Sequence, residues 1–154
     1  MEIADALRRF GAVVPSDLKQ LWRRIVFNVL ISNTDDHLRN HGFLYQGNSG
    51  WALAPAFDLN PVPVDVKPRV LSTAIDLENA TASIDLALGV AEYFDLKASE
   101  AKGIAAEVGL VITKWREEAK RAGIAEAEIN RMSSAFDHED LKKAIPSSTT
   151  AHQG

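Results

Sequence analysis

The sequence predicts a mainly α-helical domain with one small β-hairpin between residues 42 and 53. Three observations predict it: an apolar stripe with helical spacing near the N-terminus, two short strand-like segments joined by turn residues, and helical periodicity from about residue 82 onwards. A length of 154 residues fits one domain whose core needs no disulfide or metal. We therefore expect a single domain over residues 1–146 and a flexible tail over 147–154.

Two helices are predicted before the first polar loop, one over residues 3–10 and one that follows Pro15. Gly11 ends the first helix. The second has Ser16 as its N-cap and ends near Ser32-Asn33. Its apolar residues repeat at i, i+3, i+4, i+7 and i+8, which is the stripe of a helix that packs on a core. This stripe consists of Leu18, Leu21, Trp22, Ile25, Val26, Val29 and Leu30.

A polar loop over residues 33–41 comes next, and a hairpin follows it. Residues 42–45 and 51–53 have strand-like composition, and the turn residues 46–50 separate them. Residues 54–70 are predicted to be irregular because four of the six prolines fall there. These are Pro55, Pro61, Pro63 and Pro68.

The rest of the chain is expected to be helical. Apolar spacing predicts one helix over Ile84–Phe94, a longer one over Ser99–Arg121 and a third over Ile129–Phe136, after a break at Gly123. A further helical turn is expected within Asp137–Ile145. The whole outline is one hairpin set among five or six helices.

Composition excludes several classes of function. Apolar residues make up 46% and charged residues 25%, values typical of globular domains. The chain has no cysteine, which excludes disulfide frameworks, thiolate zinc sites and cysteine nucleophiles and is compatible with a reducing compartment. A net charge of −4 argues against a general binder of nucleic acids or anionic membranes. No run is long enough to span a bilayer and no signal peptide is visible, so we expect a cytoplasmic protein.

The most informative residues are those that phosphoryl transfer to a hydroxyl would need. This reaction needs a carboxylate that accepts the proton of the attacking hydroxyl, and oxygen ligands for magnesium near the phosphates. In protein kinases the base Asp and a metal-binding Asn are five residues apart, and a second metal-binding Asp follows a short hairpin. Asp35 and Asn40 are five residues apart here, and Asp58 follows the predicted hairpin. This order is more specific than either short motif alone.

The expected geometry follows from this order. A packed helix anchors the loop and the hairpin turns the chain back, so Asn40 and Asp58 can converge on one Mg²⁺ ion. Asp35 would stay ionised near this cation and act as the base. His37, two residues after the base, would contact the transferred phosphate or hold the loop in place.

Two segments resemble the C-terminal lobe of the HipA-like serine/threonine kinases, which are toxins of bacterial toxin–antitoxin pairs. They are Ile31–Leu44, which contains Asp-x-His-x-x-Asn, and Pro55–Pro61, which contains Phe-Asp-Leu-Asn-Pro. The resemblance covers nearly the whole chain and implies the helical C-lobe of a protein-kinase-like fold. It implies that Asp35 is the catalytic base, that Asn40 and Asp58 hold Mg²⁺, and that His37 is the motif's histidine. ATP would be the phosphate donor.

The resemblance also implies partners and a missing part. Protein substrates would be components of translation such as aminoacyl-tRNA synthetases, and the regulator would be a small DNA-binding antitoxin. Only 34 residues precede Asp35, and they include no Gly-rich loop and no strand-borne lysine. We therefore expect the C-terminal part of such a kinase, without the N-terminal lobe that covers ATP. Alone, it should bind ATP weakly and be inactive or nearly so.

Three other functions remain open at this point. The first is a non-catalytic helical module that docks an antitoxin or a separate kinase half. The second is a metal-dependent phosphohydrolase that uses Asp35, Asp36, His37, His41 and Asp58. The third is a small-molecule phosphotransferase, because sugar and lipid kinases also use a base Asp followed by a metal-binding Asn. In the kinase interpretation Asp36 is a solvated or capping carboxylate and His41 is structural.

Overall fold

The computed structural model describes residues 1–72, 75 and 80–145, and the tail expected over 147–154 lies outside this range. The described chain is mainly helical with a two-stranded antiparallel hairpin, as predicted. No helix in these residues has the length and apolar character that crossing a bilayer requires. The described α-helices are α1 (Glu2–Phe10), α2 (Val14–Leu30), α3 (Ile84–Gly89), α4 (Ala98–Ile112), α5 (Trp115–Arg121), α6 (Glu126–Arg131), α7 (Ser133–Phe136) and α8 (Glu139–Ala144).

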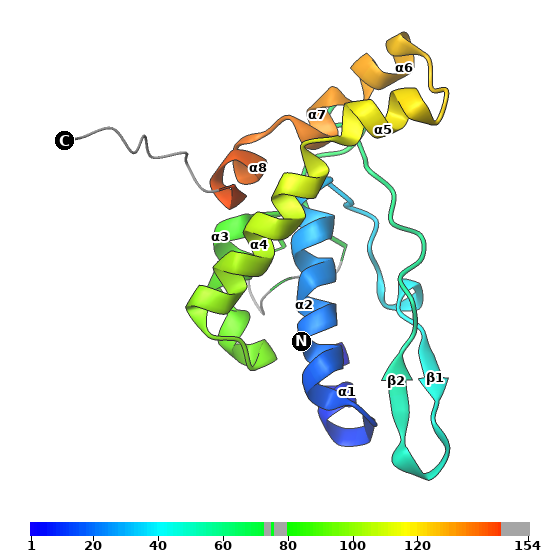
Figure 1. Ribbon diagram of the computed structural model, residues 1–154, viewed down its shortest axis with the longest axis vertical. Helices are drawn as coiled ribbons and strands as arrows, with labels where there is room; N and C mark the ends of the chain where they lie inside the picture. The colour runs from blue at the N-terminus through cyan, green and yellow to red at the C-terminus, as the bar shows by residue number, and fades with distance from the viewer. Residues whose placement is uncertain (73–74, 76–79, 146–154) are drawn as a thin grey trace, which may run out of the picture.

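Helix α2 is the centre of the structure. Figure 1 shows α3, α4 and α8 on one side of it and the hairpin on the other, while α5, α6 and α7 extend from one end. Its apolar stripe faces the core as predicted: Ile25 is partly buried, the other six residues are buried, and Trp22 is fully buried. The indole Nε1 of Trp22 donates to the carbonyl of Ala87 at 3.0 Å, which ties α2 to α3. Helix α2 therefore joins the helical side of the domain to the hairpin side.

The two ends of α2 differ from the prediction. The helix begins at Val14, and Pro15 occupies its first turn, where a missing N–H costs nothing. Ser16 is therefore inside the helix, so the prediction that it is the N-cap was wrong. The helix ends at Leu30, two residues early, because Ser32 adopts the left-handed conformation with φ 54°. The Asn33 N–H then returns to the carbonyl of Asn28 at 2.8 Å and closes the helix end.

The hairpin consists of β1 (Phe43–Tyr45) and β2 (Trp51–Leu53), with Leu44 opposite Ala52. A 3₁₀ turn, η2 (Gly47–Ser49), joins the strands. At the end of α1, the Ala12 N–H donates to the carbonyl of Trp51 at 2.7 Å, so the hairpin is held beside α1. Gly50 has φ 107°, and a Cβ there would lie 2.4 Å from the carbonyl oxygen of Phe10, so this contact requires glycine.

Each of the three predicted later helices is divided. Ile84–Phe94 forms α3 and the 3₁₀ segment η3 (Ala91–Phe94). Ser99–Arg121 forms α4 and α5, because the Thr113 hydroxyl donates to the carbonyl of Leu110 at 2.7 Å and competes with the backbone pattern. The third predicted helix likewise forms α6 and α7. The helical turn expected after Asp137 is present as α8.

Candidate functional site

The polar loop starts from a buried base, which we call the loop base and define as Ser32, Asn33 and Thr34. All three residues are almost fully buried. The Asn33 Nδ2 donates to Asn28 Oδ1 at 3.0 Å, and the Ser32 hydroxyl donates to the carbonyl of Ala135 at 2.8 Å. These bonds fix the direction in which the loop leaves α2. In the described part of the chain, Asn33 Oδ1 and Thr34 Oγ1 are buried without a hydrogen-bond partner.

A clamp of charged and polar side chains, Arg69, His138 and Asp140, holds the end of α2. Arg69 donates to the Ser32 hydroxyl at 3.0 Å, to the carbonyl of Val29 at 2.9 Å and to Asp140 Oδ2 at 2.6 Å. The His138 Nε2 lies 3.1 Å from the carbonyl of Leu30. Two carbonyls that end a helix without intrahelical partners are thus satisfied.

Burial of the His138 imidazole lowers its pKa, and the positive charge of Arg69 lowers it further. The lowered pKa favours the neutral form of the ring beside Leu30. The clamp could not be predicted from the sequence, because its members are separated by up to 71 residues and share no motif.

Asp35 follows the loop base and is exposed, with 70% of its side chain accessible. The side-chain Nδ2 of the buried Asn40 donates to the backbone carbonyl of Asp35 at 3.4 Å. These two predicted site residues are therefore in direct contact. The ammonium group of Lys67, which sequence analysis did not single out, lies 3.8 Å from Asp35 Oδ1.

His37 precedes the short 3₁₀ segment η1 (Leu38–Asn40), and its carbonyl accepts the N–H of Asn40 at 2.8 Å. This backbone bond fixes the spacing between His37 and Asn40, which are both predicted site residues. The imidazole is half-buried, and within the described residues its Nδ1 is buried without a hydrogen-bond partner. The position of His37 is compatible with either of its two predicted roles, since the backbone holds the loop and the ring retains an unused nitrogen.

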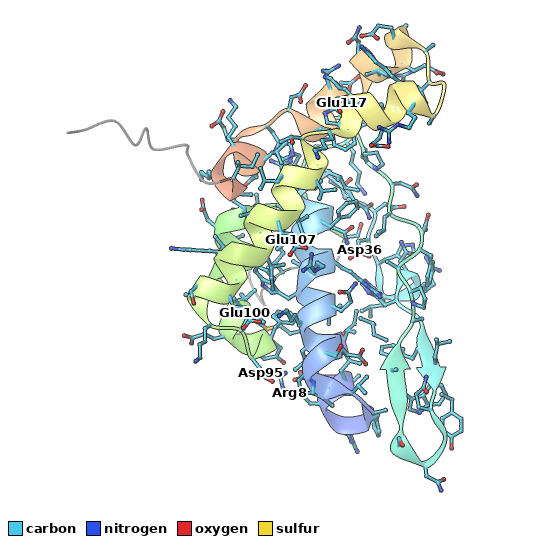
Figure 2. The ribbon with its side chains drawn as sticks, in the orientation of Figure 1. Arg8, Asp36, Asp95, Glu100, Glu107 and Glu117 are labelled. Carbon is cyan, nitrogen blue, oxygen red and sulfur yellow. The ribbon has the colours of Figure 1, made fainter. Side chains whose placement is uncertain are left out.

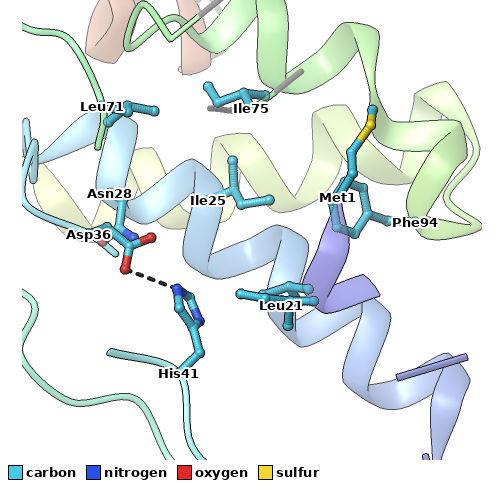
Figure 3. A pocket seen from close by; sticks show the side chains of 10 residues that line it. Met1, Leu21, Ile25, Asn28, Asp36, His41, Leu71, Ile75 and Phe94 are labelled. Carbon is cyan, nitrogen blue, oxygen red and sulfur yellow. Dashed lines mark ion pairs between the residues drawn. The ribbon is translucent and has the colours of Figure 1, made fainter. Parts of the chain in front are cut away.

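Of the two alternatives predicted for Asp36, a solvated or a capping carboxylate, the solvated one is wrong. Asp36 is only 9% exposed, and its Oδ1 lies 3.0 Å from His41 Nε2 (Figure 3). Figure 2 places it on the side of α2 that faces the hairpin. The adjacent aspartates therefore lie in different environments, since the side chain of Asp35 is exposed and that of Asp36 is buried. That His41 is structural stays a prediction, and its buried contact with Asp36 is compatible with it.

The Asp36–His41 pair lines a cavity of about 40 Å³ together with Asn28 and apolar residues that include Leu21 and Ile25 (Figure 3). A cavity of this size has room for water, and Asn28 Nδ2 is buried there without a protein partner among the described residues.

The Arg24 guanidinium, which donates to the carbonyl of Ala54, is also buried. Burial lowers the pKa of Arg24, and the carboxylates of Asp17 and Asp36 act against this shift.

Asp58 lies in a segment that runs beside the polar loop. The Ala54 N–H donates to the carbonyl of Gly42 at 2.9 Å, and the Val62 N–H donates to the carbonyl of Ser32 at 3.2 Å. Because Gly42 follows the loop and Ser32 precedes it, the segment with Asp58 near its middle is tied to both ends of the loop.

The Asp58 carboxylate is exposed and is oriented locally. The residue has φ 58°, a conformation that is uncommon outside glycine and often found at functional sites. The Asn60 Nδ2 donates to Asp58 Oδ1 at 2.6 Å. In the described part of the chain, Asp58 bonds to Asn60 rather than to Asp35 or Asn40.

The donor set suits magnesium. A carboxylate from Asp58 and an amide oxygen from Asn40 are hard oxygen ligands, and the bond from Asn40 Nδ2 to Asp35 fixes which way that amide is turned. The described residues include no group of three or more His, Asp or Glu side chains arranged to hold a metal ion. The phosphohydrolase hypothesis, which needs such a group, therefore gains no geometric support.

Comparison with known proteins gives two findings. The family model for the HipA-like C-terminal domain matches residues 1–138. A curated protein of Haemophilus influenzae, described as a "Putative kinase", is 37% identical over 57 residues, which are 37% of this chain and 16% of the relative. This match therefore spans about a sixth of the relative's length. No solved structure matches.

Proposed function

The chain belongs to the family of HipA-like C-terminal domains, and from this premise we propose that it is the catalytic-loop and metal-binding part of a HipA-like serine/threonine kinase. One observation carries the proposal. The segment around Asp58 is tied to both ends of the polar loop, through Gly42 and through Ser32. This arrangement supports the proposal, because the segment that contains Asp58 begins and ends at the loop that carries Asp35 and Asn40.

In the proposed reaction Asp35 accepts the proton of an acceptor hydroxyl on a protein. The hydroxyl oxygen forms a bond to the γ-phosphorus of ATP, the bond from that phosphorus to the bridging oxygen breaks, and the electron pair leaves on ADP. The exposure of Asp35 supports this role, because a general base must reach a group on another molecule. Asn40 supports the backbone of Asp35 through its Nδ2 and holds the loop in one conformation.

Asn40 and Asp58 would hold Mg²⁺, which when bound neutralises charge on the phosphates of ATP. The ordered amide of Asn40 and the Asn60-oriented carboxylate of Asp58 support this assignment. A lobe elsewhere in the whole kinase would cover ATP. The proposed acceptors are components of translation such as aminoacyl-tRNA synthetases, and the proposed regulator is a small DNA-binding antitoxin.

The test is calorimetric titration of the 154-residue chain with ATP, with and without Mg²⁺. We expect weak binding that requires Mg²⁺ and is lost in Asp58→Asn. Asp65→Asn is the matched control, because Asp65 is an exposed aspartate seven residues further along the chain. Equal binding by both variants would contradict the assignment. A γ-phosphate transfer assay on the same chain should show little or no turnover.

A second candidate function, docking without catalysis, is favoured by one surface. An apolar cavity of about 400 Å³ lies between α1 and the hairpin, lined by Ala6, Leu7, Phe10, Gly11, Phe43 and Trp51. The aromatic residues among these are partly exposed, and such patches are typical of interaction sites. If an antitoxin or a kinase half docks here, Trp51→Ser should lose binding to that partner. The wild-type chain should then show no Mg²⁺-dependent binding of ATP.

A further inference from the structure

Lys67 belongs to a segment that crosses the polar loop, and we call residues 61–72 the strap. The backbone of the strap is tied to the loop base at both ends, by Val62 N–H to the carbonyl of Ser32 at 3.2 Å and by Ser72 N–H to the carbonyl of Thr34 at 3.2 Å. Lys67 lies between these two bonds. Its Nζ donates to the carbonyl of Thr34 at 3.3 Å and lies 3.8 Å from Asp35 Oδ1.

Stability does not explain where this ammonium group lies. The pair with Asp35 is long and exposed, and exposed ion pairs of this kind contribute little to folding. The strap is also held without it, by the backbone bonds of Val62 and Ser72 and by the Arg69 clamp. The Lys67 side chain is 43% accessible, and an ammonium has three donors, of which the carbonyl of Thr34 takes one.

The positive charge of Lys67 explains its position beside Asp35 better than a contribution to stability does. Asp35 carries a negative charge, and in the proposed function an anionic phosphoryl group must come close to it. A cation within 4 Å of that carboxylate offsets the repulsion and can itself bond phosphate oxygens. Lys67 is the cation that the structure pairs with Asp35 in the described residues.

We propose that Lys67 binds the oxygens of the phosphoryl group that is transferred at Asp35. This inference rests on the proposed function and adds a phosphate-binding residue that the two motif segments do not contain. Its physical role is that of a point charge, since the flexible stem of lysine can follow the phosphate as it moves towards the acceptor.

The experiment measures Mg²⁺·ATP and Mg²⁺·tripolyphosphate binding to the full chain by calorimetry at low salt. Lys67→Met keeps the stem and removes the charge, and Lys67→Arg keeps the charge. We expect Lys67→Met to weaken both ligands by roughly five- to tenfold, as for a lost charge-assisted hydrogen bond, and Lys67→Arg to stay within about twofold. The matched control is Lys120→Ala, an exposed lysine paired with Glu126 at 3.2 Å, which should not change binding.

A second readout locates the contact. In ³¹P spectra of bound Mg²⁺·ATP, we expect Lys67→Met to move the line of the γ-phosphorus more than that of the α-phosphorus. Circular dichroism and urea denaturation of each variant show that folding is intact.

The outcomes separate the two proposals. If Asp58→Asn abolishes binding while Lys67→Met binds as the wild type does, the Lys67 assignment is wrong and the proposed function stands. Tighter binding by Lys67→Met also overturns it, because Lys67 would then merely compete for Asp35. If the wild-type chain binds neither ligand, the proposed function fails and the Lys67 assignment falls with it.

Discussion

The start and the tip of the polar loop are built in opposite ways. The loop base is buried, and segments as distant as Arg69, Ser72 and Ala135 bond to it. The next residue, Asp35, has an exposed carboxylate whose one charged neighbour among the described ion pairs is a lysine 3.8 Å away. The fold thus uses its long-range hydrogen bonds to fix where the loop begins and leaves the proposed base accessible. Substitutions in the two parts should therefore have different consequences.

The largest effect is expected from Arg69→Ala. This change leaves the carboxylate of Asp140 buried without its cation and removes the side-chain hydrogen bonds to Ser32 and to the carbonyl of Val29, so we expect a loss of about 3–5 kcal/mol in the free energy of unfolding. Urea denaturation measures it. Arg39→Ala, at an exposed arginine in η1, is the control and should change stability by less than about 0.5 kcal/mol. Equal losses would show that the clamp does not hold the loop base.

Asp36→Asn should have an intermediate effect. The side chain is buried against His41, and burial of a mismatched polar group costs about 1–3 kcal/mol. The measurement is again urea denaturation, with Asp65→Asn as an exposed control. An unchanged midpoint in Asp36→Asn would mean that the carboxylate is not needed in the buried pair.

The clamp should also make stability depend on pH. The pKa of His138 is lowered in the folded protein, so the unfolded chain binds the proton more readily and the free energy of unfolding falls as pH falls below the ordinary histidine pKa of about 6.5. The main physical reason is burial of the imidazole, and the positive charge of Arg69 adds to it, while Asp140 and the carbonyl of Leu30 act in the opposite direction.

Thermal unfolding followed between pH 8 and pH 5 tests this expectation. In His138→Gln the acid side of the profile should be flatter than in the wild type. A wild-type profile that stays level or rises towards pH 5, with no difference between the two proteins, would contradict the assignment of the pH dependence to His138.

The smallest effect on stability is expected from Asp35→Asn. Because the pair with Lys67 is long and exposed, the change in the free energy of unfolding should lie within about 0.5 kcal/mol. In a kinase that contains this domain, the same variant should abolish phosphoryl transfer. A large destabilisation, measured by urea denaturation, would show that Asp35 has a structural role like that of Asp36.

Regular structure could be predicted well where apolar residues repeat. The stripe of α2 and the short hairpin follow from local patterns, and the family could be named from two short segments. The divisions at Thr113 and Met132 could not be foreseen, because neither position has the Gly or Pro that marks a helix end in sequence. Side-chain hydrogen bonds from Thr113 and Ser133 to nearby carbonyls accompany those divisions.

The candidate site was less predictable than the fold. Asp35, Asn40 and Asp58 could be chosen from their spacing, but the burial of Asp36 could not, since an irregular loop has no periodicity that separates inside from outside. Lys67 and Arg69 lie in the proline-rich segment and act on residues more than 30 positions away. Only the folded chain brings them to the loop.

The contacts of Ser32 and Leu30 with Ala135 and His138 also bear on how the protein is made. These partners follow them by 103 and 108 residues, so the ribosome must release almost the whole domain before the loop base can close. A nascent chain that ends before α7 lacks both contacts and the carboxylate of Asp140. The hydrogen bonds that join the loop base and the end of α2 to Ala135 and His138 therefore form late in synthesis, after the local bonds of the loop.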